Sequence, residues 1–504
     1  MSLLSKTVSG IKWQYSSLML QLILQIIVMM VLARYILPEE YGLVSMANII
    51  VFFAIIFSQV GLGPAIIQQG DVNVKVLKSS YAFSVYIGVF IFIFLFFVAS
   101  LFSDFFNEPQ LKIILRVIGF SFIINGFGVI PRALLEKNFK FKELMITNIF
   151  SYFIGYGIIG VFLAINGFGV WTLVIALLTQ NILQILLWNY YSPKRFSLFI
   201  SLSGFKEMKF LLIFGGGQTL ISFFNTLALQ GDKFIVGKFL GTDALGFYGR
   251  SFTLMELPHR HIGGTIDRVM FPALVKIKEE EDKLKNVLFK TFSISSFILF
   301  PISFFMIFYA NEIVLIMLGP AWSLVVLPLK ILCIVMPFRT YIRIFDSLIR
   351  ALGIVYKGAK MKFIYSLSVI FFVYIGNYFG IVGVAIGVNL AVVLNFILMF
   401  YLIKRNIYFP IKSLLLELVS PLLLTIVIFF VNYLIDIVFI KLDLPIILNM
   451  LIVGVLNLMT LSILSLKAEF LMGENWYWFL NNILKSSNKS NFITRIIRKI
   501  FINE

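Results

Sequence analysis

The fold is decided by the stretch from Gly10 to Phe53, which reads GIKWQYSSLMLQLILQIIVMMVLARYILPEEYGLVSMANIIVFF. Two apolar runs are joined in it by a short polar turn, ARYILPEEYG (33–42). A helix needs ~20 mostly apolar residues to cross the hydrocarbon core of a membrane. The runs 11–33 and 43–67 therefore predict two consecutive membrane-spanning helices.

The same pattern continues along the whole chain. Of its 504 residues, 60% are hydrophobic and 13% are charged, and the mean hydropathy is +0.99. No soluble fold of this length hides that much apolar surface, so we predict an all-α integral membrane protein. We expect fourteen spans in all, at 11–33, 43–67, 79–102, 111–131, 144–165, 168–190, 210–231, 244–272, 288–309, 324–349, 361–378, 380–403, 414–436 and 445–466.

The distribution of basic residues supports this topology. If the N-terminus lies in the cytoplasm, the connections that face inward hold 30 Lys and Arg residues, those that face outward hold five, and seven lie within helices. Cytoplasmic loops of membrane proteins are enriched in Lys and Arg, which also explains the net charge of +18 without nucleic acid as a partner. We therefore expect both termini to be cytoplasmic.

The chain also contains an internal repeat. With a shift of 204 residues, Gln14 falls on Gln218 and Gly42 falls on Gly246. The tripeptide Arg-Ala-Leu occurs at 132–134 and again at 350–352, and Phe-Gly-Val at 168–170 matches Phe-Gly-Ile at 379–381. These matches occur in order and at corresponding helices, which indicates two copies of a six-helix unit.

Because six is an even number, both copies enter the membrane in the same direction. We predict an N-terminal six-helix lobe (1–195) and a C-terminal six-helix lobe (205–405) around a central cleft. Two additional helices (414–466) follow, and then a basic tail (467–504) that lies on the inner leaflet as an amphipathic segment or stays loosely ordered in solvent.

Amides recur along two of the predicted helices at spacings that place them on one face. They are Gln14, Gln21 and Gln25 in the first helix, and Gln218 and Asn225 in the seventh. Polar side chains in spanning helices avoid lipid, so these stripes either line an aqueous cleft or bond neighbouring helices.

Charged residues within the predicted spans point to an anionic ligand. In the segment 324–349 and just beyond it, Arg339, Arg343, Asp346 and Arg350 follow at spacings of 4, 3 and 4, which places all four on one helix face. Glu256, Arg260 and Asp267 lie in 244–272, with Arg250 nearby, and Lys330 and Arg116 complete the set. Charges within a membrane need a partner or a wet cavity, and the planar Arg fork suits phosphate. The alternative is a set of structural ion pairs, such as Arg343 with Asp346.

Motifs for enzymatic chemistry fail on inspection. The segment GDKFIVGKF (231–239) has its glycines too far apart for a phosphate loop, and the HRH segment (259–261) places its two His on different sides of a helix. The only cysteine, Cys333, excludes a disulfide framework and a thiolate metal site. We therefore predict a protein that is not an enzyme, with no cofactor and no metal.

Four segments resemble one known family. They are residues 10–53, VGLGPAIIQ (60–68), RALLEKNFKF (132–141) and LGTDALGFYGRS (240–251). Over residues 1 to about 410 the chain is similar to the polysaccharide transporter family, of the O-antigen, colanic-acid and teichuronic-acid type, in the multidrug/oligosaccharidyl-lipid/polysaccharide flippase superfamily.

The resemblance implies a flippase of the bacterial cytoplasmic membrane. Its substrate would be an oligosaccharide on undecaprenyl diphosphate, moved from the inner to the outer leaflet by alternating access. Polymerases and glycosyltransferases of lipopolysaccharide or exopolysaccharide biosynthesis would be partners, besides membrane lipids. With no ATP site, an ion gradient is one source of energy, and Asp232, Glu256 and Asp267 are candidate coupling carboxylates.

Two other functions stay open. A multidrug antiporter would share the fold, but we expect it to carry acidic residues for cationic drugs. A polysaccharide polymerase or ligase would have similar hydropathy, but it normally needs a long outer loop.

Overall fold

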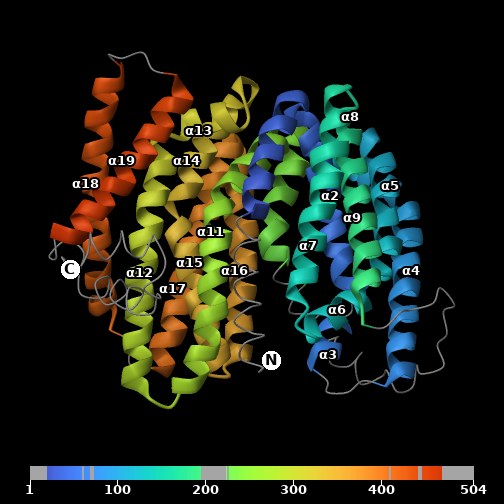
Figure 1. Cartoon of the computed structure of the whole chain (residues 1–504), viewed down its shortest axis with the longest axis horizontal. Helices are drawn as coiled ribbons and strands as arrows, with labels where there is room; N and C mark the ends of the chain where they lie inside the picture. Colours follow the sequence, from blue (N-terminus) through green and yellow to red (C-terminus); the bar gives the residue numbers. More distant parts are fainter. Residues whose placement is uncertain are drawn as a thin grey trace. The chain divides into compact units, whose positions relative to one another are not determined.

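The computed structural model describes residues 20–59, 62–68, 73–193, 223, 226–407, 410–440 and 445–467, and every structural statement below concerns these residues. They are helical almost throughout, as Figure 1 shows. After a first helix, Leu20–Tyr35, the N-terminal half contains α2 (Pro38–Gln59), α3 (Leu62–Gln68), α4 (Val74–Phe106), α5 (Pro109–Gly126), α6 (Val129–Lys137), α7 (Phe141–Tyr152), the π-helix η1 (Phe153–Gly160), α8 (Val161–Ile165) and α9 (Val170–Tyr191).

The C-terminal half continues in the same way. It contains α11 (Gly241–Ile277), α12 (Glu281–Phe308), α13 (Ala310–Met317), the 3-10 helix η2 (Pro320–Val325), α14 (Val326–Ile334), α15 (Met336–Ala351), α16 (Val355–Gly376), the 3-10 helix η3 (Asn377–Phe379), α17 (Gly380–Asn406), α18 (Ile411–Ile440) and α19 (Ile446–Lys467).

Seven helical stretches in the described part of the chain are long and apolar enough to cross a membrane, or nine if each of two bent pairs counts as one span. The prediction of an all-α, multi-pass membrane protein is therefore confirmed. The count of fourteen stays a prediction, since most of the expected span 210–231 lies outside the described residues. The expected span 244–272 does form a helix, α11, which at 37 residues is ~55 Å long but carries many charges.

Two predicted spans are broken rather than straight. The axes of α5 and α6 make an angle of 46°. The segment Pro320–Ile334, which ends with α14, makes an angle of 44° with α15. Gly126 and Gly128 flank the first break, where the backbone is least constrained. Pro337 lies in the first turn of α15, where its missing N–H costs nothing, so a new helix begins there.

The described residues form two compact units. The first contains the described residues within 1–250, 317–322 and 369–384, and the second contains those within 251–316, 323–368 and 385–504. In the first unit, α4 packs along α5 and α3 packs against α6 (Figure 1). In the second unit, α12 packs against α15 and α18. The predicted boundaries of two six-helix lobes stay a prediction.

The core of the second unit fixes the orientation of α15. Phe292 from α12 lies 5.0 Å from the ring of Tyr341 and 5.1 Å from the ring of Phe345, both on α15. Ile344 and Leu348, on the same face of α15, are fully buried in this cluster. The apolar face of α15 is therefore held inward, which leaves its charged face for the site described next.

Candidate functional site

The charged face of α15 is set by its sequence. Apolar residues recur every three or four positions on one side of this helix, and Arg339, Arg343, Asp346 and Arg350 occupy the other. A hydrogen bond ties this helix to α11, because the buried His259 Nδ1 lies 3.0 Å from Thr340 Oγ1. Gly263 of α11 faces Arg343, and a Cβ placed there would lie 3.0 Å from Arg343 Cδ.

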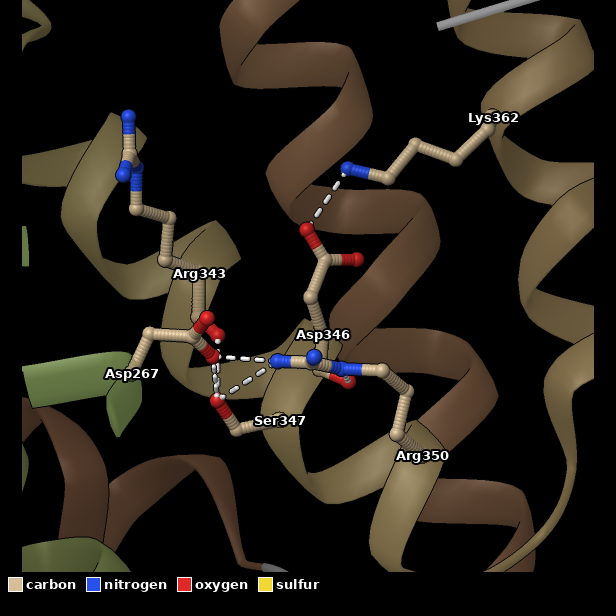
Figure 2. Close-up of polar contacts among 6 residues, drawn as sticks. All are labelled: Asp267, Arg343, Asp346, Ser347, Arg350 and Lys362. Atoms are coloured by element: carbon tan, nitrogen blue, oxygen red, sulfur yellow. Dashed lines mark hydrogen bonds and ion pairs between the residues drawn. The ribbon is translucent and has the colours of Figure 1, made fainter. Parts of the chain in front are cut away.

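The carboxylates on and beside α15 are already paired with cations. Asp346 accepts a 2.8 Å hydrogen bond from Lys362 Nζ on α16. Asp267 of α11 accepts hydrogen bonds from the Arg350 guanidinium and from the Ser347 hydroxyl. Figure 2 shows both groups. The expected pair of Arg343 with Asp346 does not form, because Lys362 from the next helix takes that carboxylate.

Arg343 and Arg339 are left without an anionic partner among the described residues. In Figure 2 the Arg343 guanidinium extends away from Asp267 and Asp346, and no described residue forms a hydrogen bond or ion pair with it. The Nε and Nη2 atoms of Arg339 are buried and have no hydrogen-bond partner in the described part of the chain. Its guanidinium carbon lies 5.2 Å from the centre of the Phe252 ring.

Such an arrangement favours binding of an anion. A buried donor without a partner loses the hydrogen bonds that water would have given it, and a buried cation loses more. Arg339 and Arg343 lie four residues apart, so their side chains emerge one above the other from the same face. Two adjacent guanidinium groups with free donors match the oxygen-rich, doubly charged chemistry of a diphosphate.

The other predicted cations of the second unit differ in their surroundings. Arg260 lies 3.4 Å from Glu256 one turn earlier on α11, and its side chain is 66% exposed. That pair is therefore an exposed contact between residues one turn apart, with Glu256 less exposed than Arg260. Lys330 on α14 is half-buried, and no interaction joins it to a described residue.

Two predicted cations of the first unit contact aromatic rings. Arg116 on α5 donates to the backbone carbonyl of Phe96 at 3.2 Å and lies over the ring of that residue, so it ties α5 to α4. Arg250 lies 3.7 Å from the centre of the Tyr41 ring. The face of an aromatic ring attracts a cation, so each ring helps to hold its guanidinium in place.

Among the proposed coupling carboxylates, Asp232 is the most buried, at 3% exposed. It accepts a 2.6 Å hydrogen bond from the Tyr248 hydroxyl and a 2.8 Å bond from the Lys233 backbone N–H. Glu256 and Asp267 are paired with arginines, as described above. The hydrogen bonds that the structure gives Asp232 come from neutral groups alone, whereas Asp267 also bonds the Arg350 guanidinium and Glu256 pairs with Arg260.

The amide stripes are only partly within the described residues. Gln14, Gln218 and Asn225 lie outside them, while Gln21 and Gln25 are half-buried on the first helix. Their role in a cleft stays a prediction. Sequence reasoning overlooked Lys362, because the lysine that neutralises Asp346 lies 16 residues away on another helix, and no spacing rule connects the two.

Comparisons with known proteins give a consistent result. The profile of a family described as "Polysaccharide biosynthesis protein" matches residues 31–327. The chain is 26% identical to the lipopolysaccharide biosynthesis protein WzxC of Escherichia coli (strain K12), over 81% of this chain and 82% of the relative. It is also 26% identical to the teichuronic acid biosynthesis protein TuaB of Bacillus subtilis (strain 168), over 81% of this chain and 85% of the relative.

Among solved structures, the lipid II flippase MurJ in an inward closed conformation superposes with a TM-score of 0.72 at 18% identity, over 90% of this chain and 99% of that one. At this identity the likeness establishes the fold alone.

Proposed function

The chain belongs to the polysaccharide biosynthesis protein family whose profile covers residues 31–327, and from this premise we propose that it is a flippase for a lipid-linked oligosaccharide. Its substrate is an oligosaccharide repeat unit of a cell-surface polysaccharide, carried on undecaprenyl diphosphate. The protein moves this lipid from the inner to the outer leaflet of the bacterial cytoplasmic membrane, with both termini in the cytoplasm. It acts as a transporter and not as an enzyme.

One observation carries the proposal: Arg339 and Arg343 lack an anionic partner among the described residues, although each neighbouring carboxylate has a cation. A diphosphate supplies the missing negative charge and several acceptor oxygens. Opening to either leaflet would follow from rocking of the two six-helix lobes that the repeat predicts.

The same charge balance disfavours export of cationic drugs. A site for such a drug needs a carboxylate that is free to pair with it. On α11 and α15, however, Glu256, Asp267 and Asp346 each have an Arg or Lys partner. Arg339 and Arg343, which have no ion-pair partner among the described residues, would repel a positively charged drug at this face of α15.

For energy coupling, Asp232 is the best of the three proposed carboxylates. It is buried, and the hydrogen bonds that the structure gives it come from two neutral groups, the Tyr248 hydroxyl and the Lys233 backbone N–H. We propose that an ion or proton moves on and off this group during transport. Asp232→Asn should therefore abolish the dependence of flipping on an ion gradient.

The test of the proposed function is export in cells that lack their own copy of the protein. Arg343→Ala should lower export at least about tenfold, because it removes a charge-assisted hydrogen bond to the substrate. Arg343→Lys should restore part of it, since a point charge replaces the planar fork. Lys283→Ala, which removes an exposed cation from a surface pair with Glu280, is the matched control and should export normally. Normal export by Arg343→Ala at equal amounts of membrane protein would refute the proposal.

A further inference from the structure

A cavity lies within the first unit, apart from the arginines of α15. Its volume is about 360 Å³, and α2, α3, α4, α5, α6 and α9 contribute to its wall. The polar lining includes Arg132 and Glu136 from the RALLEKNFKF segment, Asn125 at the end of α5, and Trp188 on α9. The size is that of a small-molecule site with a few placed polar groups.

The charges of this cavity cancel locally. Arg132 Nε donates to Glu136 Oε1 at 2.9 Å, one turn away on α6. The Arg132 guanidinium also lies 5.4 Å from the centre of the Trp188 ring. Unlike Arg339 and Arg343, this arginine is already neutralised, so the cavity has no excess positive charge for a diphosphate.

The wall nevertheless offers free hydrogen-bonding groups. Trp188 lines the cavity as a residue that is 7% exposed, and its indole N–H is buried and has no hydrogen-bond partner among the described residues. The Asn125 side-chain amide forms no hydrogen bond within the described part of the chain. The Ser58 and Ser84 hydroxyls donate to backbone carbonyls and so keep acceptor lone pairs. Donors and acceptors are thus interleaved around a neutral space.

We propose that this cavity binds sugar residues of the transported oligosaccharide. A sugar is neutral, carries hydroxyl groups that both donate and accept, and has apolar C–H faces for the tryptophan and isoleucine side chains in the wall. Because the Arg132–Glu136 pair uses one contact, its remaining N–H groups and carboxylate oxygen can bond hydroxyls of a sugar ring while that contact stays. The inference rests on the proposed function and adds a sugar site to it, separate from the groups that hold the diphosphate.

Gly63 gives a way to fill the cavity without straining the backbone. It lies in α3 at the cavity wall, and a Cβ placed on it would have only the Ala133 Cβ nearby, at 4.0 Å. Gly63→Leu therefore places a side chain in the space where the sugar would sit. Gly454→Leu is the matched control, because it adds the same side chain to a glycine of α19 that has no neighbouring atom within 4 Å.

The experiment measures binding by the purified full-length protein in lipid nanodiscs. The probes are undecaprenyl diphosphate without sugar and the same lipid carrying glucose, galactose, N-acetylglucosamine or mannose, all of which are neutral sugars. The wild-type protein should bind at least one sugar-bearing probe about tenfold more tightly than the bare lipid, as expected from one or two net hydrogen bonds. Gly63→Leu should abolish this preference and leave binding of the bare lipid unchanged, while Gly454→Leu should change neither.

The outcomes separate the sugar site from the proposed function. If no sugar-bearing probe binds more tightly than the bare lipid, or if Gly63→Leu keeps the preference, the sugar site is wrong. If Gly63→Leu weakens binding of the bare lipid as much as binding of the sugar-bearing probes, the cavity holds the diphosphate instead. That result also overturns the assignment of a sugar site. Arg343→Ala should weaken all five probes equally, and failure of the wild-type protein to bind the bare lipid would count against the proposed function.

Discussion

At the level of single residues, the partner of Asp346 determines how substitutions on α15 should combine. Because Asp346 pairs with Lys362 and not with Arg343, the two residues act separately. Arg343→Ala removes a contact to the substrate, and Asp346→Ala leaves Lys362 without its anion. We expect the double variant to export no better than Arg343→Ala alone, since neither change relieves the other.

The measurement is the amount of surface polymer in cells with each of the three variants, at matched protein levels. A direct pair of Arg343 with Asp346 predicts the opposite order, with the double variant better than either single one, because no charge is left buried alone. Normal export by the double variant would show that Arg343 does not hold the diphosphate.

A second residue, Glu108, gives a prediction about pH. It precedes α5, outside the spanning segments, and partial burial raises its pKa. A hydrogen bond from Thr242 lowers the pKa, while the negative charges of Glu39 and Asp243 raise it further. A raised carboxyl pKa means that the folded state holds this proton more tightly than the unfolded chain does. Its contribution to stability is therefore present at acid pH and lost as the pH rises through the folded pKa.

Glu108→Gln should consequently raise the melting temperature of the purified protein at neutral pH and leave it unchanged well below pH ~4, near the usual glutamate pKa. The amide oxygen can still accept the bond from Thr242. A melting temperature that falls at neutral pH would show that the charge on Glu108 stabilises the fold.

How far the sequence could predict the site depends on the distance along the chain. The spacing of Arg339, Arg343 and Arg350 correctly placed them on one face of a helix, because that face follows from helical geometry alone. Pairing of Arg350 with Asp267 joins residues 83 positions apart and depends on how α11 packs on α15. The sequence therefore indicated a charged face but not which of its charges are neutralised.

At the level of elements, the straight spans were easier to predict from the sequence than the broken ones. Long apolar runs predicted α4, α9 and α12 well, since each is one uninterrupted helix. The breaks at Gly128 and Pro337 have local causes in the sequence, yet the runs around them are apolar on both sides, so hydropathy alone joins them. A π-helix such as η1 has no comparable composition signal, because its residues are as apolar as those of the helices around it.

The contact between α4 and α5 provides a prediction about an element. Gly88 lets the two backbones approach, and a Cβ placed on it would lie 2.3 Å from the Phe122 carbonyl oxygen. The Ser84 hydroxyl donates to the Gly126 carbonyl at 2.8 Å along the same contact. Small residues of this kind allow close packing of helices in membranes.

Gly88→Ala should therefore destabilise the protein by about 1–3 kcal/mol, because the helices must separate to admit the methyl group. Thermal unfolding in detergent measures the effect. Gly454→Ala is the control and should be neutral or slightly stabilising, since its site is open and alanine favours helix. Equal melting temperatures for both variants would mean that α4 and α5 can separate at no cost.

At the level of the whole molecule, the distribution of charge predicts which ends of the helices face the cytoplasm. Lys142 and Lys404 belong to the basic connections that should lie inside, and Gln110 lies at a connection that should lie outside. All three side chains are exposed. The only cysteine of the chain, Cys333, is buried, so Cys333→Ala gives a background in which a single introduced thiol can be followed.

In that background, Gln110→Cys should react with a membrane-impermeant maleimide in intact cells. Lys142→Cys and Lys404→Cys should react only after the membrane is opened, because positively charged connections are retained in the cytoplasm. These two positions are separated by the internal repeat, so agreement between them requires an even number of spans from one to the other. Labelling of just one of the two lysine positions in intact cells would give an odd number, and the parallel arrangement of two six-helix lobes would then be impossible.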